Sequence, residues 1–227
     1  MAKNKRMTTL YQGFEKETVY PIKEALAIVK KAATAKFDET IELHFRLGID
    51  PKKGDQQVRG TAVLPHSFGE AKKVAAFVAE SKEKEAKEAG ADVIYTVDNM
   101  ETLKKTGKID FDIAVATPDM MKNLAPLARM LGPKGLMPSP KNDTITTNLK
   151  KTIDELKKGK IAFKNDDSAN LHQGIGKVST DDKALSENFT TFLDALQKAK
   201  PEGTKGSYIK GITVCSTMGP GVKVEIK

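Results

Sequence analysis

The sequence predicts an α+β domain that is built from both ends of the chain and interrupted by an inserted α/β domain. Residues 39–50 alternate between apolar and polar side chains, as in a half-buried antiparallel strand, and this alternation returns beyond residue 160. Between these regions, short apolar runs alternate with charged helical stretches, a pattern typical of a parallel sheet. We therefore expect a discontinuous domain of residues 1–67 and 160–227 and an insert of residues 68–159.

The composition favours a folded protein with an anionic partner. The chain has 227 residues, 38 Lys plus Arg against 30 Asp plus Glu, and a formal net charge of +8. Such an excess favours nucleic acid as a partner without proving it. Cys215 stands alone, which excludes an intrachain disulfide and favours a reducing cytoplasm; we expect it to be a small buried residue on a strand. A signal peptide and a membrane span are not expected, because no long uncharged apolar run occurs.

The N-terminal part begins with a helix and two strands. Pro21 starts a segment with helical spacing that ends near Ala35. The next strand, "ETIELHFRLGID", is followed by a turn and by "QQVRGTAVLP", a second strand that stops at Pro65. In the first strand, Ile41, Leu43, Phe45 and Leu47 share the core face, and Glu42, His44 and Arg46 share the other face.

The insert has the rhythm of a βαβαβ unit. Its three apolar runs are "KVAAFVA", "ADVIYTV" and "FDIAVAT", with helical stretches between them. Near-continuous apolar strands indicate a sheet covered on both faces, so we expect a three-layer Rossmann-like domain. A helix over "PDMMKNLAPLARML" then leads into a stiff basic loop, "RMLGPKGLMPSP", and a further helix ends at Gly159.

The C-terminal part returns to the antiparallel pattern. "KIAFKND" reads as a strand, "ALSENFTTFLDALQKAK" as a helix that ends at Pro201, and "GSYIKGITVCSTMG" and "VKVEI" as strands.

Motifs for catalysis are missing or incomplete. The three histidines, His44, His66 and His172, fall on separate predicted elements without metal-ligand spacing. The segment around "QGIGKVS" does not match the phosphate-binding loop motif, because Leu171 stands where glycine is required and Val178 where Ser or Thr is required. The turn after the first insert strand also has no glycine for a pyrophosphate. We therefore expect no enzyme, no metal and no cofactor.

Three features fit nucleic-acid binding, although each has a structural alternative. Phe37, next to Lys36, can seal the core or contact a nucleotide. The polar face with Glu42 and His44 can be solvated or can meet a ligand. Met218 in "STMGPGVK" precedes glycines that allow close approach of a partner, but a β-turn explains them as well.

Several long segments together resemble the large-subunit ribosomal protein L-one family. They are "KFDETIELHFRLGIDPKKGDQQVRGTAVLPH", "FDIAVATPDMM", "LGPKGLMPSPK", "IGKVS" and "YIKGITVCSTMGPGVKV". The resemblance implies a cytoplasmic, ribosome-associated protein, monomeric when free, whose terminal domain binds ribosomal RNA of the mobile stalk. It also implies that the insert faces exit-site tRNA and helps deacylated tRNA to leave, and that the protein represses translation of its own operon mRNA. The alternatives are a regulator that binds mRNA only and, more remotely, an enzyme that uses the insert.

The resemblance also implies site residues. The surface for rRNA and mRNA would comprise Lys36, Phe37, Thr40, Glu42, His172, Gly174, Lys177, Ser216, Thr217, Met218 and Gly219. The basic loop would present Arg129, Lys134 and Lys141 to tRNA, or would serve as a rigid brace between the domains.

Two segments depart from the family pattern. "DDSANLHQGIGK" has Asp167 where the family has a lysine, and Gln173 and Gly174 where it has Ala-Pro, so a phosphate contact at position 167 is in doubt. "PHSFGE" replaces a glycine-rich basic junction with Phe68 and Glu70, which leads us to expect a hinge of different stiffness.

Overall fold

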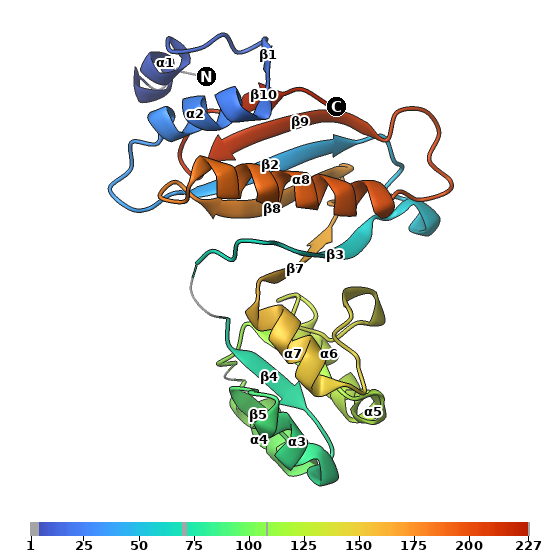
Figure 1. Cartoon of the computed structure of the whole chain (residues 1–227). Coiled ribbons are helices and arrows are strands. Elements are labelled where there is room, and N and C mark those ends of the chain that lie inside the picture. Colours follow the sequence, from blue (N-terminus) through green and yellow to red (C-terminus); the bar gives the residue numbers. More distant parts are fainter. Residues whose placement is uncertain (1–4, 70–71, 108, 227) are drawn as a thin grey trace. The chain divides into compact units, whose positions relative to one another are not determined.

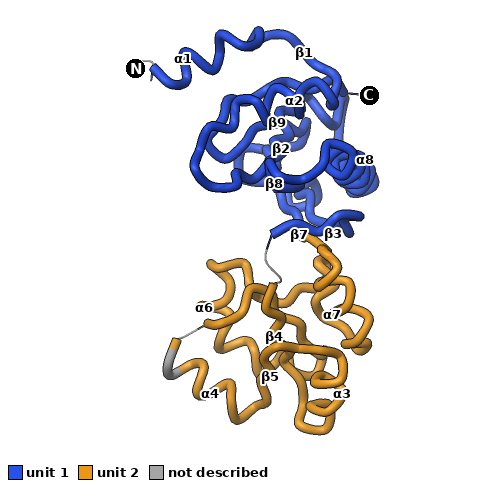
Figure 2. Tube along the Cα trace, turned by 60° about the vertical axis from the view of Figure 1, so that its left-hand side comes forward, with its two compact units in different colours: residues 1–69, 162–227 blue, residues 70–161 orange. Residues whose placement is uncertain are grey.

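The computed structural model describes residues 5–69, 72–107 and 109–226. The chain divides into two compact units, residues 1–69 with 162–227 (unit 1) and residues 70–161 (unit 2), as coloured in Figure 2. The division falls two residues beyond each boundary expected from the sequence. Glu70, one of the two departures at the junction, lies outside the described residues. In the described parts of the chain, no helix is both long and apolar enough to cross a membrane.

Unit 1 is a mixed five-stranded sheet with helices on one face (Figure 1). The strand order is β1-β10-β9-β2-β8, in which β1 and β10 are parallel and the other neighbours antiparallel. The strands are β1 (Val19–Tyr20), β2 (Thr40–Leu47), β8 (Asn170–Lys177), β9 (Ile209–Ser216) and β10 (Val222–Val224). The helices are α1 (Lys5–Tyr11), α2 (Ile22–Ala32) and α8 (Asp182–Lys198), with a 3₁₀ turn at Gly54–Gln56. A separate pair, β3 (Arg59–Val63) and β7 (Lys160–Lys164), continues the chain towards and from unit 2.

The core of unit 1 follows from the alternation in β2. Ile41, Leu43, Phe45 and Leu47 are all buried, which confirms the face predicted for them. Helices α2 and α8 cover this face, and the ring of Phe45 packs against Phe192 of α8. The opposite face of the sheet carries the polar side chains of the same strand.

A buried amide fixes the chain where it leaves unit 1. The side chain of Asn188 on α8 is fully buried; it accepts a hydrogen bond from the His66 N–H (3.0 Å). It also donates to the carbonyl oxygens of His66 and Ile175, each at 2.8 Å. Because the Asn188 side chain is itself fully buried, its hydrogen bonds tie the residues before unit 2 to helix α8 and strand β8.

Unit 2 is a parallel three-stranded sheet, in the order β5-β4-β6, with a hydrophobic core on each face. Helices α3 and α7 bury one face, and α4, α5 and α6 the other. The strands are β4 (Val74–Phe77), β5 (Val93–Tyr95) and β6 (Ile113–Ala116), and the helices are α3 (Glu83–Glu88), α4 (Val97–Thr106), α5 (Met121–Leu124), α6 (Ala128–Leu131) and α7 (Leu149–Lys157). Short 3₁₀ turns occur at Glu80–Lys82, Pro118–Met120, Ala125–Leu127 and Pro140–Asn142.

The prediction of one continuous helix over residues 118–131 is wrong. The segment consists of α5 and α6 separated by a 3₁₀ turn at Ala125–Leu127. Pro126 lies in this turn, where it has no N–H to donate and its ring would clash with the carbonyl of a regular helix. Helix α1 and strand β8 are further elements that the sequence patterns did not predict.

The basic loop begins as a capped helix end. The Leu136 N–H donates to the Leu131 carbonyl (3.0 Å) and the Gly135 N–H to the Gly132 carbonyl (2.9 Å), as in a Schellman motif. Gly135 has φ of 70°, the left-handed conformation that this motif requires. Met130, Leu136 and Met137 pack against the core of unit 2. The methionines of this loop therefore anchor it.

Unit 1 should fold without unit 2. We expect residues 1–69, joined to residues 162–227 by a short glycine–serine linker, to unfold in one cooperative urea transition monitored by circular dichroism, because the sheet and both covering helices are retained. Adding Asn188→Ala should lower the free energy of unfolding by about 2–3 kcal/mol, since buried hydrogen-bonding groups lose their partners. A broad, non-cooperative transition of the linked protein itself would contradict this expectation.

Candidate nucleic-acid interface

Three segments of unit 1 meet at one end of the five-stranded sheet. Strand β2 is antiparallel to both of its neighbours, so its first residues lie beside the last residues of β8 and β9. Thr40 pairs with Lys177, and Ile41 with Ser216. We call the residues gathered here the strand-end surface: Lys36, Phe37, Thr40, Lys177, Ser216, Thr217, Met218 and Gly219.

A buried carboxylate holds two of these segments together. Glu39 is 1% exposed and accepts hydrogen bonds from the backbone N–H groups of Ala35 (3.0 Å) and Met218 (3.0 Å). Burial by itself raises the pKa of the Glu39 carboxyl, but the nearby Ser216 side chain and the hydrogen bonds from the Met218 and Ala35 backbone outweigh it and hold the pKa below its ordinary value of 4.5. The ionised carboxylate thus fixes both loops.

The threonines add a second set of bonds. The Thr40 N–H donates to the Thr217 hydroxyl (3.0 Å), and the Thr217 N–H donates to the Thr40 carbonyl (3.0 Å). The Lys177 ammonium donates to the Thr40 hydroxyl (2.9 Å). The ammonium of Lys177 and the hydroxyl groups of Thr40 and Thr217 are therefore held close together at this end of the sheet.

Two large apolar side chains remain exposed on this fixed backbone. Phe37 is 56% exposed and Met218 is 49% exposed. The N–H of Met218 is bound by Glu39, and its carbonyl accepts a hydrogen bond from the Arg6 guanidinium (3.0 Å), so that helix α1 also contributes to the site. The core-sealing alternative for Phe37 is wrong, because more than half of the residue's surface is exposed to solvent. Apolar groups in this position can stack on bases at little cost in conformational entropy.

Two glycines lie in close packing at this surface. A Cβ atom at Gly219 would lie 2.4 Å from the Ser216 hydroxyl, which itself is buried below it. A Cβ atom at Gly174 would meet Thr40 at 3.3 Å and the ring of Phe68 at 3.4 Å. Phe68 thus lies next to Gly174, so the altered junction segment contacts this surface directly. The sequence identified Phe68 as a departure, but gave no sign of this contact.

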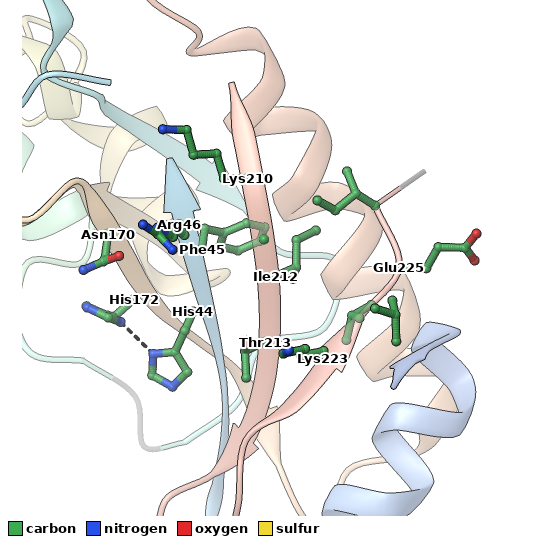
Figure 3. A pocket seen from close by; sticks show the side chains of 14 residues that line it. His44, Phe45, Arg46, Asn170, His172, Lys210, Ile212, Thr213, Lys223 and Glu225 are labelled. Atoms are coloured by element: carbon green, nitrogen blue, oxygen red, sulfur yellow. Dashed lines mark hydrogen bonds between the residues drawn. The ribbon is translucent and has the colours of Figure 1, made fainter. Parts of the chain in front are cut away.

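Glu42 and His172 extend the site along the open face of the sheet. This face bears a hollow of about 680 Å³, lined among others by Arg46, Lys210 and Lys223 (Figure 3). Figure 3 also shows His44 and His172 side by side, with their Nδ1 atoms 2.6 Å apart. The two histidines fall on neighbouring strands and form a direct contact, which no spacing in the sequence had indicated.

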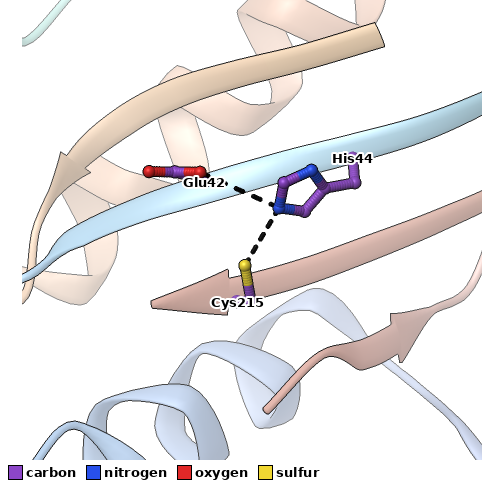
Figure 4. Close-up of side chains that lie close together, drawn as sticks. All are labelled: Glu42, His44 and Cys215. Atoms are coloured by element: carbon purple, nitrogen blue, oxygen red, sulfur yellow. Dashed lines mark hydrogen bonds and ion pairs between the residues drawn. The ribbon is translucent and has the colours of Figure 1, made fainter. Parts of the chain in front are cut away.

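His44 also joins Glu42 and Cys215 in a compact group (Figure 4). Its Nε2 lies 2.9 Å from the Cys215 sulfur and 3.9 Å from a Glu42 oxygen. Burial, and next the neighbouring His172, lower the pKa of His44 against the opposing effect of Glu42. Burial and the Glu42 charge raise the pKa of the Cys215 thiol to about 11. The expectation that Cys215 lies on a strand is confirmed, since it belongs to β9, but the expectation that it is buried is wrong, because it lies on the partly exposed polar face.

Other residues of interest lie elsewhere. Asp167 is exposed and precedes β8, whereas Lys177 ends that strand, so the two lie at its opposite ends. Arg129, Lys134 and Lys141 are exposed on unit 2, around the anchored loop.

Residues 29–220 match the model of a known family, described as the ribosomal protein L1p/L10e family. The matched region contains the strand-end surface, strands β2, β8 and β9, and all of unit 2. This family consists of structural, RNA-binding proteins of the large ribosomal subunit and not of enzymes.

Replacing the buried carboxylate should loosen the site in a pH-dependent way. We expect Glu39→Gln to lower the free energy of unfolding by about 1–3 kcal/mol at neutral pH, because its amide NH₂ faces a backbone N–H where the carboxylate accepted a bond. The folded-state pKa of Glu39 is depressed, so its stabilisation is present above 4.5 and is lost as the pH falls through the folded value.

Urea unfolding of both proteins at neutral pH and below 4.5 measures this difference. The matched control is Glu202→Gln, at an exposed carboxyl of the same unit, which should change stability by less than about 0.5 kcal/mol. A stability gap for Glu39→Gln that stays constant with pH would argue against the role of the ionised carboxylate.

Proposed function

Because the chain belongs to the ribosomal protein L1p/L10e family, we propose that unit 1 binds large-subunit ribosomal RNA through the strand-end surface and so forms the mobile stalk. The observation that carries this proposal is the exposure of Phe37 and Met218 on a backbone fixed by Glu39. Two exposed apolar side chains at the same end of the sheet can bind one partner, and a rigid backbone presents them with little loss of entropy on binding.

The neighbouring groups suit a folded RNA. The ammonium of Lys177 can neutralise a phosphate, and the hydroxyls of Thr40 and Thr217 can bond to 2′-OH groups or phosphate oxygens. Met218 and Phe37 can stack on or wedge between unstacked bases. Glu42 and His172 add polar groups on the adjoining face, and Gly174 and Gly219 let the RNA backbone approach. Recognition of this kind depends on RNA shape and backbone more than on base sequence.

Unit 2 is proposed to contact tRNA at the exit site and to help deacylated tRNA leave. Arg129, Lys134 and Lys141 are exposed, while Met130 and Met137 hold the same loop on the core. Exposed cations on an anchored loop give a firm electrostatic contact to a passing phosphate backbone.

A second role is repression of the protein's own messenger RNA by the same surface. A surface that reads shape accepts any RNA with the same fold, so a messenger leader that imitates the ribosomal site needs no second interface. Feedback requires the ribosomal RNA to bind more tightly. A preference of ~10 to 100-fold is about 1.4 to 2.7 kcal/mol, which one or two contacts can supply. A regulator that binds mRNA alone would lack this preference.

We predict that Met218→Asp weakens binding to a stalk rRNA fragment at least tenfold, about 1.4 kcal/mol, because it removes an apolar contact and adds a charge that repels phosphate. Lys134→Ala, on unit 2, should change this affinity less than about twofold, a difference of ~0.4 kcal/mol. The matched control is Val63→Asp, which adds the same charge at an exposed apolar position of unit 1. Filter binding at fixed salt measures the affinity of all three variants. Equal losses of affinity from Met218→Asp and Lys134→Ala would show that the proposal places the interface on the wrong unit.

We also predict that the leader of the protein's own operon and the rRNA fragment compete for one surface. Thr217→Val should weaken both RNAs by a similar factor, because the hydroxyl lies within the strand-end surface. Competition binding with labelled rRNA measures this. Simultaneous binding of the two RNAs, or a Thr217→Val protein that loses rRNA and keeps the leader, would show separate sites.

A further inference from the structure

We infer that Glu42, His44 and Cys215 form a binding site for one Zn²⁺ ion, with His172 as a positioning residue. The three proposed ligand atoms lie within 4.8 Å of one another on the partly exposed face of the sheet. This site is a property of the protein alone and does not depend on the proposed RNA-binding function.

The pairing of three strands brings these side chains together. Glu42 and His44 are two residues apart on β2, so they point to the same face. Cys215 on β9 is the direct partner of Glu42, and His172 on β8 is the direct partner of His44. The backbone positions are therefore fixed by the sheet, which gives a preorganised set of ligands.

The contacts of His172 assign the ring nitrogen of His44 that can bind a metal. The Nδ1 atoms of the two rings are 2.6 Å apart, so one proton lies between them. The Nε2 of His172 lies 3.6 Å from an Asp166 carboxylate oxygen, which favours a proton on that Nε2 and leaves the His172 Nδ1 as acceptor. His44 then donates from Nδ1, as metal-bound histidines commonly donate from their second nitrogen, and its Nε2 lone pair faces Cys215 and Glu42.

This arrangement leaves room for a favourable interaction with a cation. In that tautomer, the Glu42 carboxylate oxygen lies 3.9 Å from a nitrogen lone pair with no proton between them. The thiol can donate one hydrogen bond to the nitrogen, at 2.9 Å, but it leaves the carboxylate without a donor in this group. A cation between the three atoms interacts favourably with all of them.

The ligand types select the metal. Sulfur and imidazole nitrogen favour Zn²⁺ over Mg²⁺ or Ca²⁺, which prefer oxygen ligands alone. Glu42 and His44 have side chains 36% and 31% exposed, so a fourth position remains accessible to water. Three protein ligands with one accessible position are a known zinc arrangement.

Metal binding by the untagged, reduced full-length chain tests the proposal. Titration of ZnCl₂ against a chromophoric chelator should show one equivalent bound, and Co²⁺ should give a thiolate-to-cobalt charge-transfer band. We expect Cys215→Ser and His44→Ala each to weaken Zn²⁺ binding at least tenfold and to remove or reduce that band. The matched control is His66→Ala, because His66 pairs with Glu187 at 2.6 Å away from any thiol.

The role of His172 has its own readout. His172→Ala should weaken Zn²⁺ binding several-fold, whereas His172→Gln, whose side-chain oxygen can still accept from His44, should restore most of the affinity. Equal losses in both variants would remove His172 from the proposal as a positioning residue.

A measurement on the wild-type chain tests Zn²⁺ binding even if a variant fails to fold. Cys215 is the single cysteine in the sequence, so alkylation by iodoacetamide reports on it alone. One equivalent of Zn²⁺ should slow this alkylation at least tenfold. Unchanged alkylation with Zn²⁺, or a folded Cys215→Ser protein that binds Zn²⁺ like the wild type, would overturn the site.

Discussion

The position of strand β2 between β8 and β9 is the constraint on which unit 1 depends. β2 comes from the N-terminal part of the chain, and both of its neighbours come from the C-terminal part. Neither part can complete the sheet alone, because a central strand needs hydrogen-bonding partners on both edges. All of unit 2 is therefore inserted between strands that must pair. The β3–β7 pair and the buried Asn188 amide hold the two connecting segments at unit 1.

The same pairing creates the strand-end surface. Since β2 runs antiparallel to both neighbours, the loop before it and the turns after β8 and β9 meet at one end of the sheet. Glu39 makes the surface rigid, because its buried carboxylate accepts a hydrogen bond from a backbone N–H of each of two segments. The surface can expose Phe37 and Met218 without local flexibility. A site built from main-chain bonds in this way is selective for shape, since its geometry does not adapt to the ligand.

Periodicity predicted the elements whose side chains follow a simple rule. The alternation in β2 identified its buried face, and the apolar runs of the insert identified β4, β5 and β6. Strand β8 was not predicted, because Gly174 and Gly176 weaken the pattern of a strand and invited comparison with a phosphate-binding loop. The break at Pro126 was visible in the sequence, but our prediction treated residues 118–131 as one helix.

The contacts of the site depend on pairing register, which one sequence does not contain. His44 and His172 are 128 residues apart, and only the alignment of β2 with β8 makes them neighbours. Cys215 was expected to be buried because free cysteines are among the most buried residue types, but its face depends on register, since a shift of one residue in a strand exchanges the two faces. The periodicity of the sequence did not decide whether Phe37 is buried or exposed. The family resemblance favoured the alternative in which it contacts RNA.

Glu42 belongs to both the proposed RNA surface and the proposed metal site, and this links the two. Entry of Zn²⁺ with loss of the Cys215 thiol proton would raise the local charge by one unit, because two positive charges enter and one leaves. A more positive face attracts phosphate more strongly, at the cost of the carboxylate as an acceptor for RNA hydroxyls. Whichever effect is larger, equilibrium linkage requires RNA to change the affinity for Zn²⁺ by the same factor as Zn²⁺ changes the affinity for RNA. One carboxylate on a central strand is thus sufficient to couple the two ligands without any movement of the fold.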